Sequence, residues 1–334
     1  MADDQEKTAS PFVAVLVGAS KQWILLILIA FFAFFSLAAP GFFSVLGVTN
    51  IAVYTAEPLL LALGETFVII SGGIDLSVGA LLGFTGVVSA LLMKALWLST
   101  HNVTPSILIS AVAGLGVGTA LGAINGLLIA KLKVPPFVVT LGMLGIARGC
   151  TFILTAGHSI IGLPEVLGIV GNYYIFGFLP ISALITVMLV LLAYFILAKT
   201  RLGRYTYSIG GSRQASIRSG VPVDGYTIRI YALSGFMAAW AGILILARFS
   251  TGSPLAGQNS ELNSIAAAVI GGTSLMGGIG TIPGTVVGAL IVGVLLVGLV
   301  IMNVQPYWQM VSVGGILILA VFIDNIRYRR GNAE

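Results

Sequence analysis

The sequence predicts an all-α membrane protein, a polytopic bundle of about ten transmembrane helices. Hydrophobic residues make up 58% of its 334 residues and charged residues only 8%, whereas charged residues are about 25% of a soluble domain. The apolar residues form runs long enough to cross a bilayer, which takes about 20 apolar residues in a helix. These runs are continuous rather than alternating, which favours helices over a β-barrel.

Ten predicted spans follow one another with short connections, and they form a single domain over residues 21–326. The spans are residues 23–39, 51–71, 76–98, 105–130, 136–156, 178–198, 227–247, 262–275, 282–302 and 306–323. The eighth is too short to cross alone and ends at Gly277 and Gly278. It is either tilted or a half-helix that stops inside the bundle.

The first span resembles the core of a signal peptide, with Leu37, Ala38 and Ala39 as a cleavage motif. The apolar run is long for that role, and Pro40 follows it directly. We therefore interpret it as a membrane span, preceded by a polar tail over residues 1–20. A basic tail over residues 327–334 follows the last span.

Basic residues are distributed unequally between the two sides of the predicted bundle. With the N-terminus inside, the cytoplasmic flanks hold Lys7, Lys21, Lys131, Lys133, Lys199, Arg201, Arg204, Arg213, Arg218, Arg229, Arg327, Arg329 and Arg330. The outer side holds only Lys94 and Arg248, as the positive-inside rule requires. An even number of spans places both termini in the cytoplasm. The net charge of +5 thus reflects topology and indicates no nucleic-acid partner.

The fourth span carries glycine at every fourth position, at Gly114, Gly118, Gly122 and Gly126. This spacing puts the four glycines on one helical face, and small faces allow helices to pack closely in lipid. Helix packing is the favoured interpretation, and lining of a passage is the alternative.

A weak internal repeat is also present. Residues 68–73 read VIISGG and residues 269–272 read VIGG, and each is followed by a Gly-Ala-Leu triplet. Transporters are often built from repeats.

The sequence lacks the motifs of several chemistries. It has no G-x-x-x-x-G-K-[ST] phosphate loop, no H-E-x-x-H and no G-x-S-x-G. The histidines, His101 and His158, are too few to predict a metal site, and the single Cys150 excludes an internal disulfide. The sequence therefore predicts no enzyme, no metal and no cofactor.

Three ionisable residues fall inside predicted spans, namely Glu57, Glu65 and Arg148. Each costs about 2.5–3.5 kcal/mol at the bilayer centre, so such residues usually face a cavity or a partner. With Asn125 of the fourth span, they are candidates to line a translocation pathway. The alternatives are an ion pair with Arg148 or hydrogen bonds to neighbouring helices. Asp75, just before the third span, is predicted to cap that helix.

The longest cytoplasmic loop, residues 199–226, contains the pattern of a short helix at 213–219. Ser212 is a predicted N-cap, Gly220 a predicted terminator, and Pro222 prevents continuation. Such a helix is not stable alone, which favours docking into the groove of a partner protein. A helix lying on lipid headgroups is the alternative. The candidate contact residues are Ser212, Arg213, Gln214, Ala215, Ser216, Ile217, Arg218 and Gly220.

Four stretches carry a resemblance to a known family. They are GGIDLSVGALLG at 72–83, TRLGRYTYSIGG at 200–211, ASIRSGVPV at 215–223 and ELNSIAAAVIGGTSLMGGIGT at 261–281. The chain resembles the permease subunits of bacterial ABC importers for ribose, xylose, arabinose and galactofuranose, and the ribose permeases most. The sequence differs from the family pattern at Glu65, where methionine is common, and at Glu57.

The resemblance implies a multi-pass permease in the bacterial inner membrane. It implies three partners: a cytoplasmic ATPase, a periplasmic sugar-binding protein, and a second permease, either a copy or a homologue. The family's coupling helix maps onto the short helix at 213–219. An ion- or proton-coupled secondary transporter using Glu57, Glu65 and Arg148 is the alternative function, and an intramembrane enzyme or structural subunit is a third.

Overall fold

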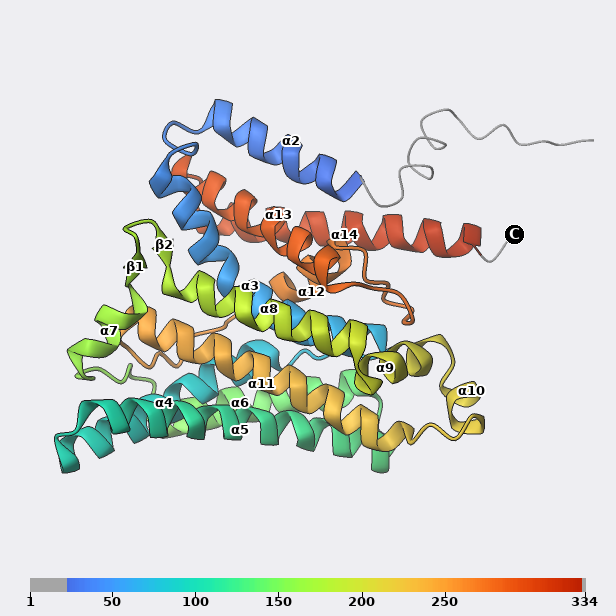
Figure 1. Cartoon of the computed structure of the whole chain (residues 1–334), viewed down its shortest axis with the longest axis horizontal. Helices are drawn as coiled ribbons and strands as arrows, with labels where there is room; N and C mark the ends of the chain where they lie inside the picture. Colours follow the sequence, from blue (N-terminus) through green and yellow to red (C-terminus); the bar gives the residue numbers. More distant parts are fainter. Residues whose placement is uncertain (1–22, 332–334) are drawn as a thin grey trace, which may run out of the picture.

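The computed structural model describes residues 23–331, which form a bundle of helices (Figure 1). The predicted tail at 1–20 lies outside the described residues. The long helices are α2 (Trp23–Ala38), α3 (Val45–Ile70), α4 (Val78–Thr100), α5 (Val103–Lys131), α6 (Pro136–Thr155), α8 (Ile181–Lys199), α11 (Val223–Phe249), α13 (Ile282–Ile301) and α14 (Pro306–Gly331). Shorter elements are α7 (Glu165–Gly171), α9 (Arg201–Gly211), α10 (Arg213–Arg218), α12 (Ser260–Ile270), β1 (Tyr174–Ile175) and β2 (Leu179–Pro180).

Seven of the described helices are long and apolar enough to cross a membrane. They are α3, α4, α5, α6, α8, α11 and α13. Shorter apolar stretches occur in α2, α12 and the first part of α14. The predicted all-α bundle is therefore confirmed, with seven candidate membrane spans among the described residues.

One connection differs from the all-α prediction. The span expected to start at residue 178 begins at Ile181, because Leu179 and Pro180 pair antiparallel with Ile175 and Tyr174 in a small hairpin. The helix α7 precedes the hairpin and packs on α11.

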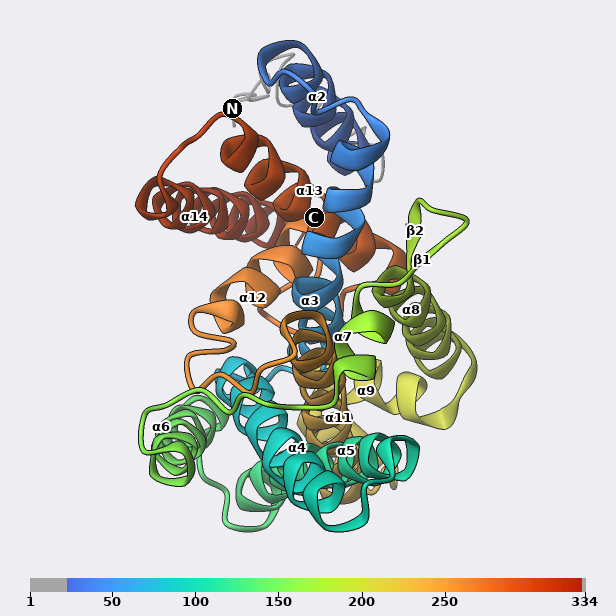
Figure 2. The same ribbon diagram turned by 90° about the vertical axis from the view of Figure 1, so that its left-hand side faces the viewer.

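Helix α3 forms the centre of the bundle (Figure 2). Within an apolar stretch of 18 residues, 83% of the residues of α3 are buried, whereas 22% are buried in the corresponding stretch of α5. It packs against α11, α13, α12 and α8. A hydrogen bond of 2.6 Å between the hydroxyls of Thr66 and Thr285 joins α3 to α13, and such polar contacts join helices in lipid.

The most extensive helix pair is α5 with α11, and the four predicted glycines of α5 lie in this contact or beside it. A Cβ added at Gly122 would lie 2.2 Å from the carbonyl oxygen of Tyr231, and one at Gly126 would lie 2.6 Å from the Cα of Ile228. Added Cβ atoms at Gly114 and Gly118 would meet Ser89 and Ala239 at 2.1 and 2.7 Å. Residues with side chains at these positions would force the helices apart.

Helix α12 has 11 residues, fewer than the predicted eighth span. It begins inside the bundle, where Ser260 contacts Glu57 in the middle of α3, and it ends beside the start of α13, where Gly271 packs on Gly284. It ends as α3 does. The N–H groups of Gly72 and Gly73 donate to Ile69 and Val68 at the end of α3, and those of Gly272 and Thr273 donate to Val269 and Ala268 at the end of α12. Gly72 and Gly272 have positive φ, +83° and +88°, which favours glycine. The weak internal repeat thus includes one shared helix ending.

The described ends of the chain lie at one end of the molecule. The start of α2 and the end of α14 point to the same side as α9 and α10 (Figure 1). Helix α14 extends past the predicted span and includes the first part of the predicted C-terminal tail.

Candidate functional site

The short helix predicted in the loop is α10, and its ends have the predicted cap chemistry. The hydroxyl of Ser212 accepts a hydrogen bond of 3.2 Å from the N–H of Ala215, which satisfies a free donor of the first turn. Gly220 follows the helix with φ +77°. The turn closes there through the N–H of Gly220, which donates to Ile217, and the N–H of Val221, which donates to Ser216.

One face of α10 is anchored and the other is free. Ser216 is buried, and its hydroxyl forms a hydrogen bond of 2.7 Å with that of Ser208 on α9. Gln214, Ala215 and Arg218 are exposed, and Ile217 is 50% exposed. The exposed face therefore combines a small residue, an apolar side chain and a cation, which suits contact with another protein.

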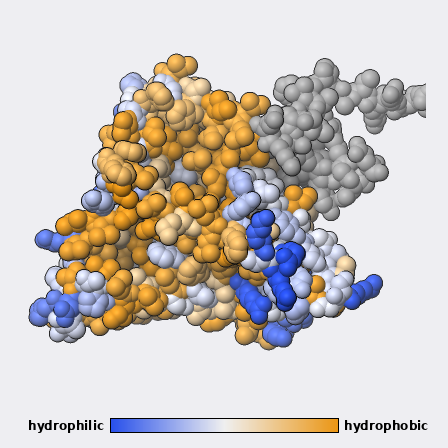
Figure 3. Space-filling view, viewed as in Figure 1, coloured by the Kyte–Doolittle hydropathy of each residue, from blue (hydrophilic) through white to orange (hydrophobic). Residues whose placement is uncertain are grey.

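Basic side chains gather around α10 and tie it to the bundle. Asp224 at the start of α11 contacts Lys131, Lys133 and Arg213 at 3.5, 3.6 and 3.4 Å. Figure 3 shows the resulting hydrophilic region at the end formed by α9 and α10, next to a broad apolar surface. This distribution matches the predicted charge asymmetry.

Helix α9 connects α10 with the centre of the bundle. At its end, Gly210 packs on the carbonyl of Ile70, the last residue of α3, and this carbonyl also accepts a hydrogen bond of 2.8 Å from the N–H of Gly278. The hydroxyl of Tyr207 donates to the carbonyl of Gly280 at 2.6 Å. A movement of α10 would thus reach the end of α3 and the loop that joins α12 to α13.

Glu57 lies toward the opposite end of α3 in a polar cluster of its own. Its carboxylate accepts a hydrogen bond from the hydroxyl of Ser260, and Arg248 is the nearby positive charge. The guanidinium of Arg248 stacks on the ring of Tyr54, 4.8 Å from the centroid.

Arg148 pairs with neither Glu57 nor Glu65, so the predicted alternative, an ion pair between Arg148 and one of these glutamates, is wrong. Within the described part of the chain, the ion pairs all involve Asp224. The Arg148 guanidinium instead donates to the carbonyls of Pro254, Ala256 and Gly257 at 3.3, 2.9 and 3.4 Å. Glu261 lies close enough to Arg148 to interact with its charge. Glu261 was not among the predicted site residues, because it precedes the predicted eighth span.

Glu65 and Asn125 lie in a third polar region, in the core between α3, α4, α5 and α11. Asp75 also lies there, in the turn before α4. Asp75 is not the N-cap of that helix, because the cap position is Ser77. Instead Asp75 accepts hydrogen bonds from the N–H and hydroxyl of Ser77 and from the hydroxyl of Ser234. Burial raises the pKa of Asp75, and these hydrogen bonds oppose the rise.

Ser234 and Tyr231 also belong to this region, although nothing in the sequence predicts it. Neither belongs to a recognisable motif, since both reach it from the middle of α11. Their contact with residues 71–77 exists only once α3 and α11 are packed together.

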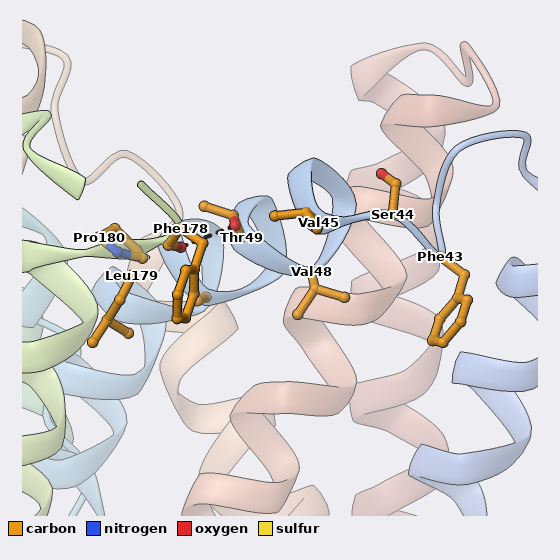
Figure 4. A pocket seen from close by; sticks show the side chains of 9 residues that line it. Phe43, Ser44, Val45, Val48, Thr49, Phe178, Leu179 and Pro180 are labelled. Carbon is orange, nitrogen blue, oxygen red and sulfur yellow. Dashed lines mark hydrogen bonds between the residues drawn. The ribbon is translucent and has the colours of Figure 1, made fainter. Parts of the chain in front are cut away.

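A groove of about 760 Å³ lies at the start of α3 (Figure 4). Its walls are mainly apolar, and the lining residues are Phe43, Ser44, Val45, Val48, Thr49, Ala52, Phe178, Leu179 and Pro180. The Thr49 hydroxyl in it donates to the carbonyl of Phe178 at 3.1 Å, and that of Ser44 donates to Gly41. A sugar requires several free hydrogen-bonding groups, so this groove is not suited to bind one.

The comparisons with known proteins agree with this arrangement. Residues 47–321 match the family described as the branched-chain amino acid transport system permease component. The chain is 38% identical to the ribose import permease protein RbsC of Escherichia coli strain K12, over 92% of this chain and 95% of that protein.

Two further relatives carry other sugars in their names. Identity is 37% to the D-allose transport system permease protein AlsC of Escherichia coli strain K12, over 91% of this chain and 90% of the relative. Identity is also 37% to the fructose import permease protein FrcC of Rhizobium meliloti, over 90% of this chain and 84% of that protein. No solved structure matches the chain. The chain therefore belongs to the family of branched-chain amino acid transport system permease components, and its relatives in that family include sugar import permeases.

Proposed function

We propose that this chain is the membrane-spanning subunit of an ATP-powered importer that moves a monosaccharide or a similar small polar solute into the cytoplasm. It performs no chemistry on the solute. In this proposal α2, α12 and α14 complete a set of ten membrane segments, both termini are cytoplasmic, and the protein resides in the bacterial inner membrane.

The observation that carries the proposal is the exposed helix α10. A solvent-facing helix of 6 residues is too short to be stable alone, and it needs a partner to explain its exposed Ile217 and Ala215. A cytoplasmic ATPase with a matching groove is such a partner. Movement of the ATPase would pass through α10 and α9 to the end of α3 and to the loop that joins α12 to α13.

Two further partners complete the transporter. A periplasmic sugar-binding protein would deliver the solute, and a second permease, identical or homologous, would form the other half of the pathway. We retain Glu57, Glu65, Arg148 and Asn125 as candidates for residues that shape this pathway. Glu65 and Asn125 are fully buried within one chain, so they would act through the positions of the helices that carry them.

Reconstitution tests the proposal. The chain, its genomically adjacent ATPase and binding protein are placed in proteoliposomes, and uptake is measured for ribose, allose, fructose and xylose. We expect uptake of one sugar that requires the binding protein outside and ATP on the opposite side. A catalytic-site variant of the ATPase should abolish it. Uptake driven by an ion gradient without the ATPase would establish the secondary-transporter alternative instead.

A further inference from the structure

Six polar side chains meet in the apolar core at the junction of α3, α4, α5 and α11. We call them the buried carboxyl cluster. Its members are Glu65, Asp75, Ser77, Asn125, Tyr231 and Ser234. Each is 0 or 1% exposed, so bulk water does not compensate any polar group that lacks a partner.

The two carboxyl groups of the cluster have opposite surroundings. Asp75 receives three hydrogen bonds, two from Ser77 and one of 2.9 Å from the hydroxyl of Ser234. Hydrogen bonds donated to a carboxyl group favour its ionised form. In the described part of the chain neither carboxyl oxygen of Glu65 has a hydrogen-bond partner. The backbone of Asp75 lies close enough to favour a charge there, but no side chain donates to Glu65 as Ser77 and Ser234 do to Asp75.

Two further members of the cluster have unused hydrogen-bonding capacity. Asn125 donates to the hydroxyl of Ser77 at 2.9 Å, but its Oδ1 has no partner. The hydroxyl of Tyr231 also has none, and it lies close enough to Glu65 and Asp75 to interact with their charges. An acceptor and a donor are therefore available near the two carboxyl groups.

Other titratable groups on the helices that pack against α3 do not neutralise this cluster. Glu261 of α12 interacts with Arg148, Tyr207 of α9 donates to Gly280, Tyr194 and Lys199 of α8 are exposed, and α13 has no titratable residue. Arg248 lies with Glu57, and Lys131 lies with Asp224. Arg229 of α11 stacks on the ring of Tyr226, and Lys94 of α4 donates to the carbonyl of Ile161. Two adjacent carboxylates in an apolar core without a cation are unstable, since like charges at close range do not both ionise.

We propose that Glu65 and Asp75 form a buried proton-binding site that holds one proton between them, carried by Glu65. In the proton-bound state Asp75 is the carboxylate and Glu65 a neutral acid that donates its O–H within the cluster. Release of the proton leaves two repelling carboxylates, which loosens the packing of α3 against α11. This site is independent of the proposed sugar transport, because it follows from the packing of a single chain.

Infrared spectroscopy of the purified full-length chain in lipid nanodiscs tests the site. A protonated carboxyl group absorbs separately from a carboxylate. We expect the wild type to show a protonated-carboxyl band at neutral pH that is lost in Glu65→Gln. The matched control is Glu165→Gln, because Glu165 is an exposed glutamate on α7 and its removal should leave the band unchanged. A wild-type band identical to that of Glu65→Gln overturns the proposal.

The second measurement is the dependence of thermal stability on pH. The folded wild type keeps a proton that an unfolded glutamate releases near its usual pKa of about 4.3, so its stability should fall as pH rises toward the alkaline range. Glu65→Gln should remove this dependence and unfold with about one fewer proton released. Equal pH dependence in both proteins contradicts the proposal.

Two arms complete the test. Sodium, compared with potassium and choline at alkaline pH, should stabilise the wild type no more than Glu65→Gln. If sodium stabilises the wild type but not Glu65→Gln, the site binds a metal cation rather than a proton. If Glu65→Gln fails to fold, Asp75→Asn is used in its place. Removing the charge of Asp75 should shift the pH at which the protonated-carboxyl band disappears to a lower value. If this pH is the same as in the wild type, the shared proton is refuted.

Discussion

The hydroxyl of Ser77 connects two buried polar side chains, since it donates to Asp75 and accepts from Asn125. We predict that Ser77→Ala destabilises the protein by about 1–3 kcal/mol, because the amide of Asn125 becomes a buried donor without a partner. Ser99→Ala, on the exposed end of the same helix, is the control. The measurement is the melting temperature in mild detergent, and equal values for the two variants would refute the prediction.

Glu65 is the second residue whose effect is testable directly. Glu65→Gln keeps the shape of the side chain and removes its ability to ionise. We predict that it alters the initial rate of solute uptake while the amount of protein in the membrane stays at the wild-type level. Uptake by reconstituted vesicles, normalised to inserted protein, checks this. Kinetics unchanged from the wild type would indicate that Glu65 has a structural role only.

Glu57, Glu65 and Arg148 are predictable from the sequence because a charge in an apolar run is conspicuous, whereas their partners are not. Ser260 reaches Glu57 across 203 positions and Ser234 reaches Asp75 across 159. Serine is common in membrane helices, so no local pattern distinguishes these two from the others.

Helix packing in the bundle depends on the glycine face of α5. A Cβ at Gly122 would lie 2.2 Å from a backbone oxygen of α11, which cannot move aside independently. We predict that Gly122→Ala costs about 1–3 kcal/mol through overpacking. Gly116→Ala is the matched control because Gly116 is exposed and an added Cβ meets nothing within 4 Å. It should be neutral or slightly stabilising, and thermal unfolding of both distinguishes these outcomes.

If helix α10 contacts the ATPase, two substitutions in or next to it should disrupt coupling. Ala215→Glu places a large charge in the expected contact with the ATPase, and desolvating an unpaired charge costs several kcal/mol. Gly220→Val strains the turn, because a β-branched residue resists φ +77°. Both variants should insert normally but lose ATPase association or the coupling of hydrolysis to transport.

The control for Gly220→Val is Gly225→Val, since both positions are exposed and open but Gly225 is helical. Copurification of the ATPase and sugar-stimulated hydrolysis are the measurements. Wild-type assembly and transport in both Ala215→Glu and Gly220→Val would exclude α10 as the coupling element.

Hydropathy predicted most of the long helices, because a membrane span needs only a continuous apolar run. Cap residues predicted α10, since Ser212 and Gly220 act locally. Helix α9 was missed although Leu202, Tyr205 and Ile209 form an apolar stripe along it, because its 11 residues are too short and too polar to be read as a membrane span. Its stability comes from close approach to α3 and α8, and such contacts are not visible along the chain.

The orientation of the whole molecule in the membrane follows from its charge distribution. We predict that a cysteine at Ser212, in a chain with Cys150 replaced by alanine, is protected from impermeant reagents added to intact cells. A cysteine at the exposed His101, at the opposite end of the bundle, should be labelled. Permeabilised cells should label both, and labelling of Ser212→Cys from outside would reverse the topology.

Helix α12 has a consequence for how the protein is made. At about 1.5 Å per residue, its 11 residues cover roughly half of a 30 Å hydrocarbon core, and Arg148 of α6 satisfies three backbone carbonyls of the segment before it. The translocon does not retain so short a segment by hydropathy alone. Helix α12 packs mainly against α3, α13 and α14, so its retention in the membrane depends on helices made both before and after it.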